Sequence, residues 1–129
     1  MKGRPPVKCC KRCGGTEFKR YGTRQNRECV ACRSKRVKDA TLRRNYGISL
    51  EQYDDLLKVQ GGRCAICRVD MEEYPRRFSV DHCHISSRVR GLLCLQCNVG
   101  LGNLRESPSL MMRALEYLLS HGGEADEGN

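Results

Sequence analysis

Four cysteine pairs with the spacing CxxC constrain this chain more than any other feature of its sequence. They are Cys10/Cys13, Cys29/Cys32, Cys64/Cys67 and Cys94/Cys97. A CxxC turn brings two thiolates to one tetrahedral metal ion, with sulfur–zinc bonds of about 2.3 Å. The 15 residues between the first and second pairs match the spacing of a zinc ribbon, and the 26 residues between the third and fourth pairs leave room for a further motif. We expect two structural Zn²⁺ sites, each with four cysteine ligands.

Two cysteines remain outside this pattern. Cys9 is open as a ligand in place of Cys10, and Cys83 lies between the third and fourth pairs. The alternative to zinc is a disulfide framework in a secreted protein. That alternative conflicts with an N-terminus that lacks the apolar stretch of a secretion signal, and disulfides are rare in the reducing cytoplasm, where we expect this protein. The apolar runs are too short to cross a membrane, so we expect no membrane partner.

Charge is distributed unevenly along the chain. The formal net charge is +9, yet residues 1–46 contain 15 lysines and arginines against three acidic residues, a net charge of +12. Residues 47–129 contain nine basic and 12 acidic residues, a net charge of −3. A basic block of this kind indicates a polyanionic partner, and nucleic acid is the expected one. The alternative, a solvated basic tail, does not account for the cysteine pairs within the block.

Hydrophobic spacing and capping signals predict the regular elements. Ser49 and Gln52 form a capping box, in which each side chain bonds to the backbone of the other residue. Pro108 after Ser107 is typical of the first turn of a helix. The expected elements are an exposed basic helix or connector over residues 33–45, a helix from residue 50 that Gly61-Gly62 ends, a hairpin of strands over 78–81 and 88–93, a helix over 94–101, and a last helix from 107 that Gly122-Gly123 ends.

The segment between the third and fourth cysteine pairs contains residues suited to catalysis. Residues 80–84 read VDHCH and include two of the three histidines. A neutral imidazole such as His82 can take a proton from water near pH 7. The carboxylate of Asp81 and the amide oxygen of Asn98 are ligands that Mg²⁺ prefers. Because phosphodiester hydrolysis requires a base and a divalent metal ion, this constellation predicts a nuclease. The alternative is that the two histidines and Cys83 are further zinc ligands or core groups.

Longer motifs resemble the phage recombination endonuclease VII family, which belongs to the His-Me finger (HNH-type, ββα-metal) nucleases. The motifs are YGIS at 46–49, QGGRCAIC at 60–67, VDHCH at 80–84 and RVRGLLCLQCN at 88–98. The resemblance covers about residues 46–104. It implies a small, metal-stabilised α+β fold, in which a ββα-metal core follows an N-terminal zinc-ribbon-like module and precedes a C-terminal helix.

The resemblance also implies roles for individual residues. His82 would be the general base that activates water, His84 would assist near the scissile phosphate, and the products would carry 5′-phosphate and 3′-hydroxyl ends. The expected site residues are Cys10, Cys13, Cys29 and Cys32 for the N-terminal zinc ion, Cys64, Cys67, Cys94 and Cys97 for the second zinc ion, Asp81 and Asn98 for one catalytic Mg²⁺ or Mn²⁺, His82 and His84 for catalysis, and Arg88, Arg90, Lys35 and Arg36 for DNA phosphates.

The chain departs from the family pattern in two places. Cys83 stands where the family often has Asp. Residues 99–101 lack the acid that some members place after the asparagine, so the catalytic metal would rest on fewer protein ligands. A single expected helix follows the finger, whereas the junction-resolving member uses a long C-terminal part for dimerisation. A monomer and a homodimer are therefore both open.

These inferences predict five modules and one principal function. The modules are a zinc-ribbon-like basic module (1–33), a basic linker helix (34–48), a His-Me finger nuclease core (49–104), a C-terminal helix (105–121) and a disordered acidic tail (122–129). We expect a Mg²⁺/Mn²⁺-dependent DNA endonuclease, encoded by a phage or prophage and acting in the cytoplasm of the bacterial host. Branched, nicked and plain duplex DNA are all open as substrates. The alternative function is a non-catalytic zinc-ribbon protein that binds nucleic acid.

Overall fold

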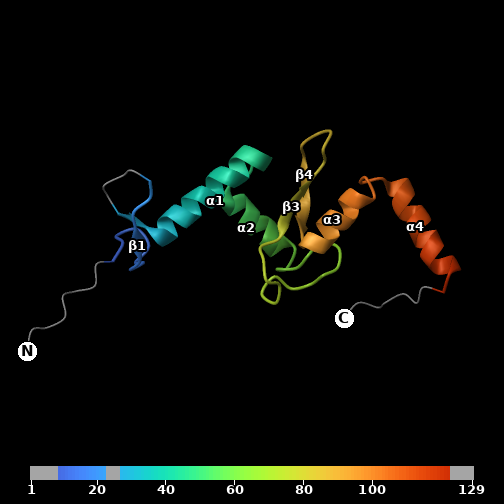
Figure 1. The fold of residues 1–129 in the computed structure, drawn as a ribbon, viewed down its shortest axis with the longest axis horizontal. Helices are drawn as coiled ribbons and strands as arrows, with labels where there is room; N and C mark the ends of the chain where they lie inside the picture. Colours follow the sequence, from blue (N-terminus) through green and yellow to red (C-terminus); the bar gives the residue numbers. More distant parts are fainter. Residues whose placement is uncertain (1–8, 23–26, 123–129) are drawn as a thin grey trace, which may run out of the picture. The chain divides into compact units, whose positions relative to one another are not determined.

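The computed structural model describes residues 9–22 and 27–122 (Figure 1). Across these residues the chain forms four helices and two antiparallel two-stranded sheets, which confirms the predicted α+β class. It divides into two compact units, Met1–Tyr53 and Asp54–Asn129. Within the described ranges, no helix combines the length and apolar character needed to cross a membrane. The acidic tail lies outside the described residues except for Gly122.

The first unit combines a short sheet with a long basic helix. Strand β1 (Phe18–Lys19) pairs with β2 (Glu28–Cys29), and α1 (Val30–Tyr46) follows directly. The helix begins three residues before the expected basic segment, so Cys32 lies in its first turn. It has no buried residues, as expected of an exposed helix, and it ends at Gly47 with a left-handed φ of 70°.

The turn after α1 is stabilised by side chains that hydrogen-bond to backbone groups. Helix α2 (Leu50–Val59) begins with the predicted capping box. The Gln52 amide N–H donates to Ser49 Oγ at 3.1 Å, and the Ser49 amide N–H donates to Gln52 Oε1 at 2.7 Å. The Leu50 amide donates to the Asp39 carboxylate at 2.8 Å, and this bond, aided by Arg43, lowers the pKa of Asp39.

The second unit is built on a hairpin and the helix that follows it. Strands β3 (Ser79–His82) and β4 (Val89–Leu93) pair antiparallel, and α3 (Leu95–Asn103) packs against both of them. Helix α4 (Pro108–Ser120) follows, with Ser107 as its N-cap and proline in its first turn, as predicted. The buried core of this unit is small and consists of Cys64, Phe78, Val80, Leu92, Leu93 and Cys94.

The side chain of Gln60 takes the place of a third strand beside β4. The Leu92 amide donates to Gln60 Oε1 at 2.8 Å, and Gln60 Nε2 donates to the Leu92 carbonyl at 2.9 Å. A Cβ atom at Gly91 would stand only 3.1 Å from Gln60 Oε1, so glycine leaves room for this contact. The amide side chain therefore satisfies an edge of the hairpin and holds β4 in register.

Candidate metal centres and active site

The first cysteine cluster has the spacing of a tetrahedral zinc site. Its four sulfur atoms, from Cys10, Cys13, Cys29 and Cys32, lie within 4.8 Å of one another, and three of the separations are 3.4, 3.5 and 3.7 Å. A tetrahedron with 2.3 Å sulfur–zinc bonds has sulfur–sulfur edges of roughly 3.8 Å. Cys10, rather than Cys9, belongs to the cluster, and all ten cysteines are free of disulfide bonds. This donor set therefore fits Zn²⁺.

Backbone amides stabilise a thiolate in this cluster, and thiolates are the form of cysteine that binds zinc. The amides of Arg12 and Cys13 lower the pKa of Cys10 to about 6. Hydrogen bonds of the Cys32 thiol with the sulfurs of Cys13 and Cys10 raise the pKa of Cys32 to about 12, because these bonds favour its protonated form. A divalent cation that binds the four sulfurs displaces this proton.

The second cluster joins two segments that lie far apart in the sequence. It consists of Cys64, Cys67, Cys94 and Cys97, with 3.6 Å between the sulfurs of Cys67 and Cys94. Burial raises the pKa of Cys64, but the amides of Cys94, Ile66 and Cys67 outweigh burial and bring it to about 7. Burial also raises the pKa of Cys97. This donor set likewise fits a structural Zn²⁺, which would link the turn at residues 64–67 to the junction between β4 and α3.

A tyrosine that the sequence did not single out supports the same corner. The Leu95 amide, in the first turn of α3, donates to the Tyr74 hydroxyl at 3.0 Å. The hydroxyl in turn donates to Gln96 Oε1 at 2.6 Å. The ring of Tyr74 packs 5.6 Å from that of Phe78 in the core. The Tyr74 hydroxyl therefore caps the first turn of α3, next to the zinc-cluster residue Cys94.

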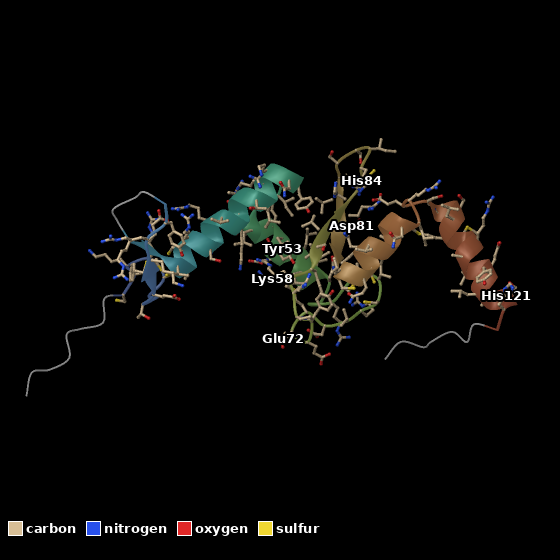
Figure 2. The ribbon with its side chains drawn as sticks, in the orientation of Figure 1. Tyr53, Lys58, Glu72, Asp81, His84 and His121 are labelled. Carbon is tan, nitrogen blue, oxygen red and sulfur yellow. The ribbon has the colours of Figure 1, made fainter. Side chains whose placement is uncertain are left out.

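A β-bulge brings Arg90 to Asp81. Asp81 lies opposite Gly91 and His82 lies opposite Val89, which leaves Arg90 as an extra residue on β4. A bulge of this kind redirects a side chain across the face of a sheet. Arg90 Nε and Nη2 each donate to one Asp81 oxygen at 2.7 Å, and Asp81 is only 8% exposed. Figure 2 labels Asp81 and His84 on the hairpin. The Asp81 carboxylate, with Glu106, raises the pKa of Arg90.

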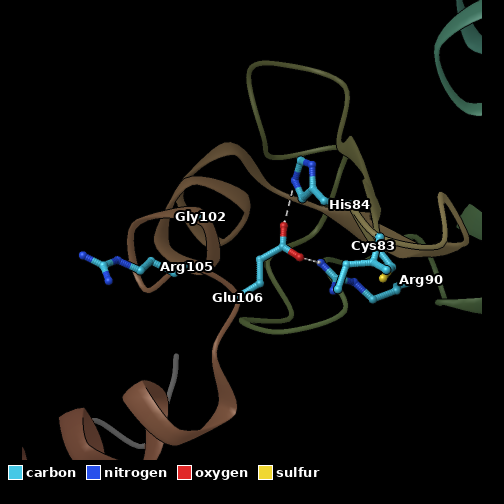
Figure 3. A pocket seen from close by; sticks show the side chains of 7 residues that line it. Cys83, His84, Arg90, Gly102, Arg105 and Glu106 are labelled. Atoms are coloured by element: carbon cyan, nitrogen blue, oxygen red, sulfur yellow. Dashed lines mark ion pairs between the residues drawn. The ribbon is translucent and has the colours of Figure 1, made fainter.

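The histidines and Glu106 extend this network. The rings of His82 and His84 lie 4.7 Å apart. His84 Nε2 is 2.8 Å from Glu106 Oε1, and Arg90 Nη2 is 3.0 Å from Glu106 Oε2 (Figure 3). These groups border an open pocket of about 450 Å³ lined by residues 83–85, 90, 102 and 105–106. Sequence reasoning missed Glu106 because it lies eight positions beyond Asn98, outside the motifs.

The other predicted site residues occupy different surroundings. Asn98 is half-buried on α3, one turn beyond Cys94, on a helix that packs against β3. Arg88 is exposed near the tip of the hairpin. On α1, Arg36 pairs with Glu28 at 2.8 Å, whereas none of the described acidic residues forms an ion pair with Lys35.

Cys83 belongs to the hairpin turn. Its amide donates to the Arg88 carbonyl at 2.8 Å, and the hydroxyl and amide of Ser86 lower the pKa of its thiol. Among the described residues, the two cysteine clusters are the groups with the geometry to hold a metal through three or more His, Cys, Asp or Glu side chains. The alternative of a third zinc site at Cys83 and its neighbouring histidines therefore has no support in this structure.

Comparison with known proteins gives one family match and two phage relatives. The family model described as recombination endonuclease VII matches residues 39–120, which is more than half of the chain. A Gene 59 protein of Mycobacterium phage D29 is 40% identical over 94 residues, covering 72% of this chain and 56% of the relative. A Gene 59 protein of Mycobacterium phage L5 is 40% identical over 96 residues, covering 74% and 58%. The chain thus spans less than two thirds of these curated relatives, and no solved structure matches.

Proposed function

Since the chain belongs to the recombination endonuclease VII family, we propose that it is a metal-dependent DNA endonuclease with a ββα-metal core of the His-Me finger, HNH type. The observation that carries this proposal is the bulged hairpin, which holds the buried carboxylate of Asp81 beside two histidines, next to α3 and a zinc-binding cluster. The phage relatives support a phage- or prophage-encoded protein that acts in the bacterial host cytoplasm.

The side chains divide the chemistry among them. Asp81 and Asn98 would hold Mg²⁺ or Mn²⁺, since each carboxylate oxygen that accepts from Arg90 keeps a further lone pair. When bound, this ion supplies a Lewis acid for the charge that develops on the phosphate and the leaving 3′ oxygen. His82 takes the proton of the attacking water. The products then carry 5′-phosphate and 3′-hydroxyl ends.

The remaining basic residues serve phosphate binding. His84 lies in the hairpin turn and Arg88 directly before β4, and both side chains are exposed, so both would be accessible to a DNA backbone. Arg90 already binds two carboxylates, and its main contribution is to orient Asp81. Helix α1 and the first cluster form a basic module that binds backbone phosphates without sequence-specific contacts to bases. We propose plain, nicked and branched DNA as the substrate class, with a monomer or a homodimer as the acting species.

The test of this function is cleavage of supercoiled plasmid by the full chain in Mg²⁺ or Mn²⁺. Asp81→Asn keeps the size of the side chain but removes its charge, and we expect a loss of roughly 100-fold, as for other groups on which a metal site depends. Asp55→Asn, on the exposed face of α2, is the matched control and should cut normally. Equal rates for Asp81→Asn and the unmodified chain would contradict the proposal. Tight DNA binding without cleavage in either metal would favour the non-catalytic alternative.

The basic helix makes a separate prediction about salt. Lys35→Ala should reduce the slope of log affinity against log salt by about 0.9, the value for one lost phosphate contact. Arg36→Ala should have a smaller effect, because Glu28 already neutralises part of that charge. Lys58→Ala, whose ammonium pairs with Asp55, serves as the control. Fluorescence anisotropy with a duplex at several salt concentrations measures the slopes, and identical slopes for Lys35→Ala and Lys58→Ala would exclude Lys35 from the interface.

A further inference from the structure

Glu106 is a carboxylate that contacts two parts of the candidate site at once. Its Oε1 lies 2.8 Å from His84 Nε2, and its Oε2 lies 3.0 Å from Arg90 Nη2. The side chain is 21% exposed, whereas that of His84 is 71% exposed. The more buried partner is thus the carboxylate, which contacts the exposed imidazole of His84 from the turn after α3 (Figure 3).

The backbone at this position is held in a conformation that few residues adopt. Arg105 and Glu106 have φ values of 54° and 52°, in the left-handed region that favours glycine. The Glu106 amide donates to the Leu101 carbonyl at 2.8 Å, so the turn wraps back on the end of α3. Arg105 points away from the site, whereas Glu106 points toward the hairpin (Figure 3). A strained backbone of this kind is retained where the surrounding structure requires it. Here it places the Glu106 carboxylate within contact of His84 and Arg90.

The contact determines which nitrogen of His84 carries a proton. A carboxylate only accepts hydrogen bonds, so His84 Nε2 must be the N–H donor. In the neutral ring Nδ1 is then the acceptor. Through its other oxygen Glu106 also holds the guanidinium that binds both oxygens of Asp81.

We propose that Glu106 is a positioning residue of the nuclease site, which holds His84 in its Nε2–H tautomer and orients Asp81 through Arg90. This inference rests on the proposed endonuclease function for its role in catalysis. Its structural part, the state of the His84 ring, holds independently of any reaction.

Glu106→Gln tests the proposal, with Glu116→Gln on the exposed side of α4 as the matched control. Gln is isosteric but offers an N–H to one of the two donors, so one contact becomes repulsive. We expect kcat for plasmid cleavage to fall about 10-fold, within the range for groups that support a metal site, with KM nearly unchanged. The double variant with His84→Ala should lose less than the product of the two single losses, because both changes remove the same contact.

The second measurement is the ¹⁵N NMR spectrum of the histidine rings in the zinc-loaded full chain without DNA. The unmodified chain should show His84 mainly as the Nε2–H tautomer, and Glu106→Gln should give a mixture of tautomers. An unchanged His84 signal in Glu106→Gln would overturn the proposal, and so would strictly additive losses in the double variant. If the unmodified chain cuts no DNA at all, the endonuclease function fails, and the ring spectrum still decides the role of Glu106.

Discussion

Removing zinc is expected to unfold the hairpin and α3, and this is the largest effect that we foresee on the fold. The buried core around them is small, and the second cluster connects the turn at residues 64–67 to the junction between β4 and α3. Structural zinc contributes roughly 10–16 kcal/mol in small metal-dependent domains, as much as or more than the roughly 5–15 kcal/mol that stabilises a typical protein. A strong chelator should therefore reduce the helical far-UV circular dichroism signal.

Single cysteine substitutions test the role of zinc at the second cluster alone. Cys94→Ser should lower the zinc content from two ions per chain to one and destabilise the Asp54–Asn129 unit. Cys9→Ser, an exposed thiol outside both clusters, is the matched control and should keep both ions. Metal analysis together with circular dichroism measures both effects. A Cys94→Ser chain that keeps two zinc ions and its helical signal, or an unmodified chain with three ions, would contradict this assignment.

The first cluster, Cys10, Cys13, Cys29 and Cys32, predicts how zinc affinity depends on pH. The contacts of Cys32 with its neighbouring thiols raise its pKa to about 12, so this thiol is protonated at neutral pH until metal displaces the proton. Zinc binding therefore releases protons, and the apparent affinity should increase as the pH rises and fall as the pH drops. Competition with a chromophoric chelator across a pH series measures this dependence.

His82→Ala is expected to lower the cleavage rate by about 10²–10⁴-fold, the usual contribution of a general base. The imidazole lies at the end of β3, one residue after the carboxylate proposed to hold the metal ion, and 4.7 Å from the His84 ring. Plasmid cleavage under saturating Mg²⁺ or Mn²⁺ measures the loss. The fold should be retained, because His82 is outside both cysteine clusters.

The chain supplies a matched control for this substitution. His121 lies at the end of α4, where its Nδ1 is 2.8 Å from the Tyr117 carbonyl and its ring stacks on that of Tyr117. His121→Ala removes the same side chain and should leave the cleavage rate unchanged. If both variants cut as fast as the unmodified chain, the base is a different group. If both lose activity equally, the loss reflects stability and not catalysis.

Local signals in the sequence predicted most of the regular structure. The capping box at Ser49 and Gln52 formed in both directions, and Ser107 with Pro108 began the last helix. The four cysteine pairs predicted both clusters, because metal coordination depends on residue type and short spacing. Where the start of a helix depended on tertiary context, the prediction was less accurate: α1 begins at Val30 because β2 leads directly into it.

The parts of the site that were missed depend on contacts between distant residues. The alternation of polar and apolar residues in β4 does not reveal the bulge. The sequence therefore predicted Arg90 as a phosphate ligand, whereas in the structure its guanidinium binds Asp81. Glu106 lies in a polar turn between two helices, where an acidic residue is unremarkable. Gln60 belonged to a recognised motif, but its role as a substitute strand became visible only beside Leu92.

The hairpin has an anchored base and a free tip, and this division has an evolutionary consequence. Gln60 and the second cluster hold the base, whereas Ile85 at the tip is 98% exposed and contributes nothing to the core. Exposed turns on a rigid scaffold tolerate changes in sequence and length. Related chains are therefore able to vary the residue at Ile85, and with it the shape presented to a substrate, while Gln60 and the second cluster hold the base of the hairpin.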